Sequence, residues 1–158
     1  MNLDQNFQDQ ILVNELGKIG AFSGSIPDLL TGDSLNAISG SVAGRLGAKH
    51  GARFLKSMSY NSKLEYPQNI QSSMEKIASI LVNTGKLINT SELLATPHLT
   101  AVVGSGALNM NPTIVCVEFI PIQPNSTSIN IFGTAKEGLI KQRSAEKAVK
   151  RIVGLLQP

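Results

Sequence analysis

The segment PQNIQSSMEKIASILVNTG, residues 67–85, has the clearest helical pattern in the chain. Its apolar residues recur at helical spacing and form one stripe: Ile70, Met74, Ile77, Ala78, Leu81 and Val82. Pro67 suits the first helical turn, where the N–H needs no partner, and Gly85 suits a left-handed residue just past the end. Burying each larger apolar side chain is worth roughly 1.5–3 kcal/mol before entropy is subtracted. The segment therefore predicts an amphipathic helix that needs an apolar partner.

Strand patterns on both sides of this helix supply that partner. Four apolar residues before it alternate with polar ones and predict a half-buried strand: Met58, Tyr60, Leu64 and Tyr66. Further strands are expected at 96–103, 113–122 and 128–134, and their short links favour antiparallel hairpins. A final helix is expected from Ser144, which would act as its N-cap. We leave the boundary within 134–143 open between a loop and a continuing strand.

The 113–122 segment is apolar on both faces and is therefore expected at the centre of the sheet. Two helices would cover one face, so the other face needs cover from residues 6–54 or from a second subunit. The predicted fold class is α+β, with two layers, about four antiparallel strands and the order strand–helix–strand–strand–strand–helix. We divide the chain into an N-terminal arm at 1–56 and a core domain at 57–158.

The N-terminal arm has weaker signals. Residues 6–16 predict a short amphipathic helix ending at Gly17, and the stretch from Gly17 to Asp33 predicts a loop because Gly, Ser and Pro interrupt it. Ser34 can cap a second helix through about Phe54. That helix contains several interior glycines, each costing up to about 1 kcal/mol, so it needs a closely packed partner. The alternative interpretation of this glycine-rich segment is a flexible connector.

Composition limits the functional classes. The chain of 158 residues predicts one compact unit, and the single cysteine, Cys116, excludes an internal disulfide framework. A reducing, cytoplasmic location is therefore expected. The first ten residues lack the pattern of a signal peptide, and no apolar run has the length of a transmembrane helix.

Charge is distributed unevenly along the chain. Up to Asp33 there are five acidic residues and one lysine, whereas the remainder has 13 Lys and Arg against six Glu. Two basic clusters follow from this distribution: Lys136, Lys141, Arg143, Lys147, Lys150 and Arg151, and Arg45, Lys49, His50, Arg53 and Lys56. Either cluster suits the phosphates of anionic lipid or nucleic acid, or is a solvated charged surface. Nucleic acid is disfavoured because the clusters lack stacking aromatic residues.

One pair of residues is a candidate for chemistry. If the 96–122 hairpin turns about Leu108, His98 lies opposite Glu118 and Thr100 lies opposite Cys116. A His–carboxylate pair can act as a general base or orient a ligand, but it is also a common cross-strand salt bridge. We take His98, Glu118 and Thr100, with Tyr60, as candidate ligand-binding residues.

Other motifs carry little chemistry. Cys116 in a Val- and Ile-rich strand is best interpreted as a small buried hydrophobe rather than a nucleophile. His50 and His98 are far apart in sequence and no metal-binding spacing occurs, so neither a metal nor a cofactor is predicted. Gly104-Ser105-Gly106 lacks the third glycine of a dinucleotide-binding loop and predicts a hairpin turn.

These observations favour a non-enzymatic binding or assembly module, because no catalytic constellation is recognisable. It would hold an apolar small molecule between sheet and helices, and a homo-oligomer is one way to cover the second sheet face. The alternative is peripheral binding to anionic lipid or nucleic acid through the basic clusters, including Lys136, Lys141, Arg143, Lys147 and Arg151. A more remote alternative is an enzyme that uses His98 and Glu118.

Overall fold

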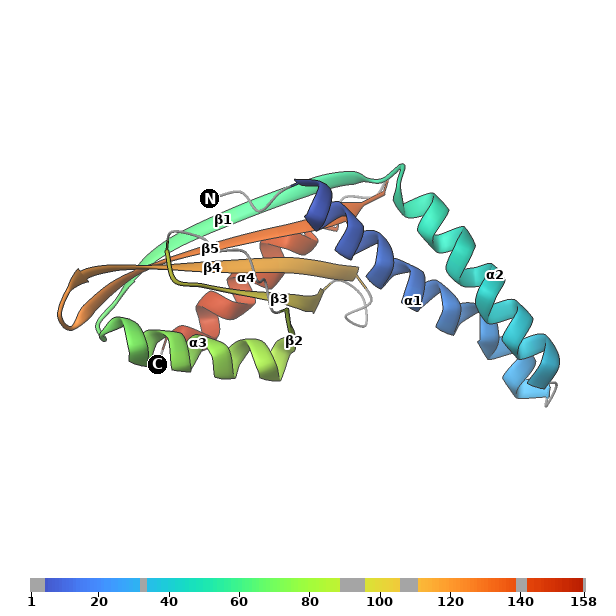
Figure 1. The fold of residues 1–158 in the computed structure, drawn as a ribbon, viewed down its shortest axis with the longest axis horizontal. Helices are drawn as coiled ribbons and strands as arrows, with labels where there is room; N and C mark the ends of the chain where they lie inside the picture. Colours follow the sequence, from blue (N-terminus) through green and yellow to red (C-terminus); the bar gives the residue numbers. More distant parts are fainter. Residues whose placement is uncertain (1–4, 32–33, 89–95, 106–110, 139–141, 158) are drawn as a thin grey trace.

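The computed structural model describes residues 5–31, 34–88, 96–105, 111–138 and 142–157 (Figure 1). Along the chain it contains α1 (Gln5–Thr31), α2 (Ser34–Ala52), β1 (Lys56–Tyr66), α3 (Ile70–Thr84), β2 (Gly85–Ile88), β3 (His98–Ser105), β4 (Asn111–Gln123), β5 (Ser126–Glu137) and α4 (Ser144–Leu156). The strands form one antiparallel sheet in the order β1-β5-β4-β3-β2. The predicted α+β class is confirmed, with five strands in place of about four because β2 adds a short edge strand.

The main core lies between one sheet face, here called the inner face, and helices α3 and α4 (Figure 1). Fully buried residues from both layers meet there, with Ile77 and Leu81 on α3, Phe119 on β4 and Val149 and Ile152 on α4. The helical stripes predicted from sequence supply these contacts. The two-helix layer on one face of the sheet is therefore confirmed.

Strand β4 is the middle strand of the five, as its two apolar faces predict. Its pairing with β3 places His98 opposite Glu118 and Thr100 opposite Cys116, so the predicted register is confirmed. The residues about which the hairpin was expected to turn, 106–110, lie outside the described ranges. The predicted turn after β4 is also present, and β5 begins at Ser126.

The opposite face of the sheet, here called the outer face, is covered at one end by α1 (Figure 1). Leu12 is fully buried against Ile114 and Cys116 of β4, and Ile11 packs on the same cluster. The expectation that residues 6–54 shield the far side of β4 is thus met at this end of the sheet. Helix α1 adds a partial third layer to the predicted two.

The N-terminal helices are longer than the sequence predicts. Helix α1 continues to Thr31, so the loop expected from Gly17 to Asp33 is wrong. Residues 34–52 are helical rather than a flexible connector. The two helices pack side by side as a hairpin whose far end extends beyond the sheet (Figure 1). Packing between two neighbouring helices outweighs low intrinsic helix propensity, which a reading of single segments misses.

Both predicted ends of α3 need correction. Pro67 precedes the helix, and Asn69 is the N-cap, whose side chain accepts a hydrogen bond from Ser72 N at 2.9 Å. Gly85 is not left-handed, because its φ is −172° and it begins β2. A Cβ at this position would overlap the carbonyl oxygen of Val102 on β3. Close approach of the neighbouring strand, and not a helix-ending turn, explains this glycine.

The start of α4 also differs from the prediction. Strand β5 continues to Glu137, which settles part of the open boundary in favour of a strand. Ser144 is the first helical residue, and the N-cap is Arg143 with a left-handed φ of 53° and no side-chain cap. The buried Glu137 carboxylate instead accepts the Ser144 N–H at 2.5 Å. A residue from the preceding strand thus caps this helix and places a negative charge at its N-terminus.

Candidate functional site

A groove opens where the end of β1, helix α3 and the last turn of α4 meet. Its volume is 440 Å³, within the range of about 300–1,000 Å³ typical of small-molecule sites. Its lining comes from these elements and from the link after β1: Leu64, Glu65, Tyr66, Pro67, Gln68, Lys76, Leu155, Leu156 and Gln157. The groove therefore lies between sheet and helices, where the sequence predicted a cleft.

The floor of the groove is continuous with the main core. Leu156 is buried in that core, and Leu64 and Tyr66 are half-buried and pack against it. Leu155 is 48% exposed beside them and adds apolar surface to the groove. The arrangement presents an apolar surface to anything that enters.

Pro67 and Gln68, which follow β1 and form one wall of the groove, belong to a segment that is held by hydrogen bonds. The backbone carbonyl of Gln68 accepts from Thr127 Oγ1 on β5 at 2.9 Å and from Ser73 Oγ on α3 at 3.4 Å. The Gln68 N–H donates to the Tyr66 carbonyl at 2.8 Å. This wall is therefore tied to both layers of the fold, which favours a preformed groove.

Polar groups stand at the mouth of the groove. Glu65, Lys76 and Gln157 are exposed there and come from β1, α3 and the residue after α4. Charges of both signs above an apolar floor suit a ligand with an apolar body and a polar end.

The four residues predicted to bind a ligand do not come together. Tyr60 lies on the inner face of β1 and packs against the main core, with the Lys150 ammonium 5.9 Å from its ring centroid. His98, Thr100 and Glu118 alternate with inner-face residues and therefore lie on the outer face. The sheet separates Tyr60 from the other three, and the role of each in binding stays a prediction.

Glu118 is held by neighbours on the outer face. Its carboxylate accepts hydrogen bonds from Thr96 Oγ1 at 2.8 Å and from Asn130 Nδ2 at 3.5 Å, and His98 Nδ1 lies 3.2 Å from the Thr96 carbonyl oxygen. Thr100 is buried beside them. These contacts orient a His and a carboxylate on neighbouring strands, as the sequence predicted, on a face where α1 packs at only one end.

Cys116 is buried, as predicted. Burial raises the pKa of its thiol, and the nearby Glu118 charge acts in the same direction. A thiol with a raised pKa is a poor nucleophile at neutral pH.

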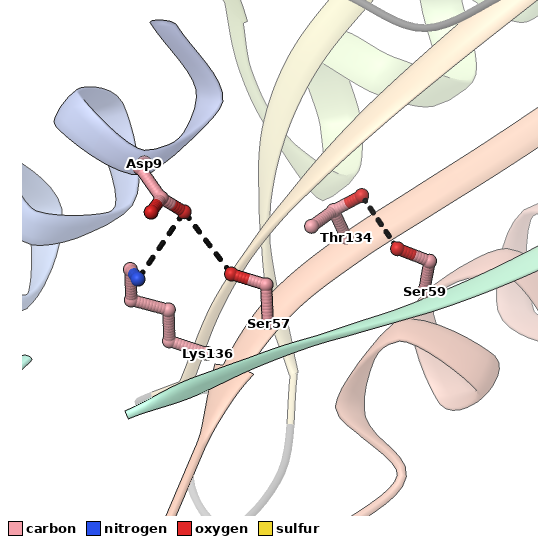
Figure 2. A network of polar contacts seen from close by, with 5 residues as sticks. All are labelled: Asp9, Ser57, Ser59, Thr134 and Lys136. Carbon is pink, nitrogen blue, oxygen red and sulfur yellow. Dashed lines mark hydrogen bonds and ion pairs between the residues drawn. The ribbon is translucent and has the colours of Figure 1, made fainter. Parts of the chain in front are cut away.

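The basic cluster at the end of the chain is divided by the sheet. Lys136 lies on the outer face with its side chain only 3% exposed, and its Nζ lies 3.2 Å from Asp9 Oδ1 (Figure 2). Arg143 and the α4 residues Lys147 and Arg151 are exposed on the helical side. Lys141 lies outside the described residues. Lys136 therefore does not join Arg143, Lys147 and Arg151 in one surface.

Two features are absent from the part of the chain that the structure describes. Among the described residues there is no group of three or more His, Cys, Asp or Glu side chains that could hold a metal ion. Within the same ranges, none of the helices combines the length and apolar character needed to cross a bilayer.

The sequence interpretation did not identify the residues that line the groove. Its walls come from segments about 90 positions apart, and no local motif links them. The one available signal is Leu155, a large apolar residue outside the inward stripe of an otherwise amphipathic helix.

No protein-family model and no curated protein matches the chain. Among solved structures, a conserved protein from Geobacillus kaustophilus is similar with a TM-score of 0.37 and 12% identity, over 63% of this chain and 90% of that chain. A protein from Nitrosospira multiformis is similar with a TM-score of 0.36 and 10% identity, over 63% of this chain and 93% of that one. The Zhui aromatase/cyclase from Streptomyces sp. R1128 has a TM-score of 0.32 and 6% identity, over 65% and 86% respectively.

These comparisons correct one prediction. The expectation that the protein is not an enzyme is wrong as an exclusion, because an aromatase/cyclase is among the similar structures. The error has a physical reason, since catalytic groups are recognised by their geometry in the fold and not by their spacing in sequence. Identities of at most 12% assign no activity or substrate to this chain.

Proposed function

We propose that the protein binds a small molecule with an apolar body and a polar end in the groove between β1, α3 and α4. The observation that carries this proposal is the apolar floor formed by Leu64, Tyr66 and Leu156 beneath the exposed Leu155. Apolar surface removed from water contributes about 25 cal/mol per Å² to binding. The polar residues at the mouth then fix the orientation of the ligand.

The rigidity of the groove supports the proposal. The hydrogen bonds from Thr127 and Ser73 to the Gln68 carbonyl hold the wall in place without a ligand. A preformed site loses less entropy on binding than one that must be ordered first.

Replacement of Leu155 tests this function. The fluorescent apolar probe 1-anilinonaphthalene-8-sulfonate is titrated into the native protein, and we expect saturable binding that Leu155→Gln weakens by about fivefold or more. The matched control is Ile120→Gln on the outer face, because Ile120 is 41% exposed and Leu155 is 48% exposed. Equal binding by Leu155→Gln and the original chain contradicts the proposal, as does an equal loss in both variants.

A second candidate function is peripheral binding to anionic membranes through α2 and the turn after it. Val42, Leu46 and Phe54 are large exposed apolar residues there. Basic residues at 45, 49 and 53 run beside them at intervals of four. Exposed apolar side chains can enter a membrane interface while neighbouring cations contact anionic headgroups.

Vesicle cosedimentation tests this candidate. We expect the chain to bind vesicles that contain phosphatidylglycerol, to bind pure phosphatidylcholine vesicles much less, and to lose binding in Leu46→Gln and Phe54→Gln. Ile120→Gln serves again as the control of similar chemistry on another surface. Undiminished binding by both α2-region variants argues against this role for the helix.

A further inference from the structure

A second cavity lies between the first turns of α1, the last turn of α2 and the end of β5. Its volume is 640 Å³. Three cations line it: Lys49 from α2, Arg53 from the turn after α2 and Lys136 from β5. The side-chain amides of Asn6, Gln10 and Asn14 on α1 also line it. This cavity is separate from the groove between β1, α3 and α4.

One of the three cations is held by an acidic partner. The Asp9 carboxylate lies between Lys136 Nζ, at 3.2 Å, and the Ser57 hydroxyl, which donates to Asp9 Oδ1 at 3.0 Å (Figure 2). In the same view Ser59 and Thr134 form a separate hydroxyl pair with their oxygens 3.3 Å apart. Among the described residues, Asp9 is the only acidic one that lines the cavity. Its charge is therefore directed at Lys136.

The other two cations remain available. Among the described residues, neither Lys49 nor Arg53 forms an ion pair with an acidic side chain. Lys49 is positioned by α1, because a Cβ at Gly17 would lie only 2.5 Å from Lys49 Cγ, so its aliphatic stem rests on that glycine. The described residues of the lining carry a formal net charge of two positive units, three cations against one carboxylate.

We infer that this cavity binds a phosphate-bearing anion of small-molecule size. The inference is independent of the proposed groove function. A guanidinium offers a fork of donors that matches two oxygens of a phosphate, and an ammonium adds a point charge. Amide groups on the α1 wall can donate to the remaining oxygens. A volume of 640 Å³ has room for a group larger than free phosphate.

Calorimetric titration of the full chain with inorganic phosphate at low ionic strength tests the inference. We expect saturable binding with one site per chain. The double variant Lys49→Gln/Arg53→Gln should weaken it at least about tenfold, since hydrogen bonds to charged groups are the strong ones. Arg53→Gln alone should weaken it about threefold or more, and this exposed position lies past the end of α2, where folding is least affected.

Lys86→Gln is the matched control, because Lys86 is an exposed lysine on the edge strand β2 and does not line the cavity. It should leave phosphate binding within about twofold. The inference is overturned if phosphate up to about 10 mM gives no saturable binding, or if Lys86→Gln weakens binding as much as the double variant.

A parallel experiment identifies the source of the phosphate. Vesicles of phosphatidylglycerol in phosphatidylcholine are mixed with the chain, with and without inorganic phosphate. Vesicle binding that phosphate displaces, and that Arg53→Gln loses, supports a lipid headgroup in this cavity. Saturable phosphate binding without vesicle binding supports a soluble phosphorylated molecule in the same cavity.

Discussion

Replacing Asp9 by asparagine removes the acidic partner that the described residues give to the buried lysine Lys136. The Lys136 side chain is 3% exposed, whereas Asp9 is 42% exposed, so the two partners have unequal access to water. Removing one partner of a fully buried ion pair costs about 3–5 kcal/mol. Because water reaches the Asp9 side of this pair, we expect Asp9→Asn to lower the free energy of unfolding by about 2 kcal/mol.

The reverse change should be milder. In Lys136→Met the carboxylate of Asp9 keeps the Ser57 hydroxyl and gains water, so a loss of about 0.5–1 kcal/mol is expected. The double variant then resembles Lys136→Met, because no unpaired buried charge remains. The coupling between the two positions should therefore be about 2 kcal/mol, the whole of the Asp9→Asn loss.

Urea unfolding of the four proteins, followed by far-UV circular dichroism, measures these free energies. A loss in Asp9→Asn below about 0.5 kcal/mol would refute the reasoning, since that is the range of exposed ion pairs. Strict additivity in the double variant would refute it equally, because the buried ammonium would then not depend on the carboxylate.

Three further predictions concern single residues. Glu137→Gln should lower stability by about 1 kcal/mol, measured by urea unfolding, because the N-terminus of α4 at Ser144 loses a capping charge; an unchanged unfolding midpoint would contradict this role. Gly85→Ala should destabilise the fold by at least about 1 kcal/mol, because the added Cβ would collide with the facing carbonyl of β3. Gly154→Ala has open space around the added Cβ and should stabilise the fold by up to about 1 kcal/mol. The midpoint of thermal unfolding should therefore fall in the first variant and rise in the second. Because burial raises the Cys116 pKa, the thiol should react slowly with iodoacetamide until urea unfolds the chain, and fast labelling of the native protein would count against this. The original chain should also lose stability as the pH rises above the ordinary thiol pKa, because the thiol ionises more readily in the unfolded state. This loss should be absent in Cys116→Ala.

The sheet could be predicted from sequence where local pattern and pairing agree. The residues of β1 alternate between polar and apolar, which predicted a half-buried strand, and β4 is apolar on both faces, which predicted its central place in the sheet. The His98–Glu118 register followed from the symmetry of a hairpin. These features depend on short-range geometry.

Features that depend on a partner far away in sequence were missed. Glycines and Pro27 suggested a loop after Gly17, yet α1 continues because α2 packs along it. The start of α4 was misassigned because its capping group, Glu137, comes from the preceding strand.

The candidate site was predicted only in outline. A cleft between sheet and helices was expected, and the structure forms its lining largely from the ends of β1 and α4. Hydrophobic periodicity predicts the helices and strands but not which helix end packs against which strand end. The charged cavity arises similarly, since Lys136 from one basic cluster and Arg53 from the other are brought together by the helical hairpin. Arg143, which is close to Lys136 in sequence, lies instead on the helical side of the sheet.

The pairing of β1 with β5 has a consequence for how the chain acquires its structure. Lys56 lies opposite Glu137, so β1 can pair only after β5, about 80 residues further along the chain, has been synthesised. Pairing between residues this far apart in sequence slows folding, whereas α1 and α2 are consecutive helices that contact each other. On the ribosome, the hairpin should therefore be in place first, with the apolar side of β1 exposed to chaperones until β5 emerges.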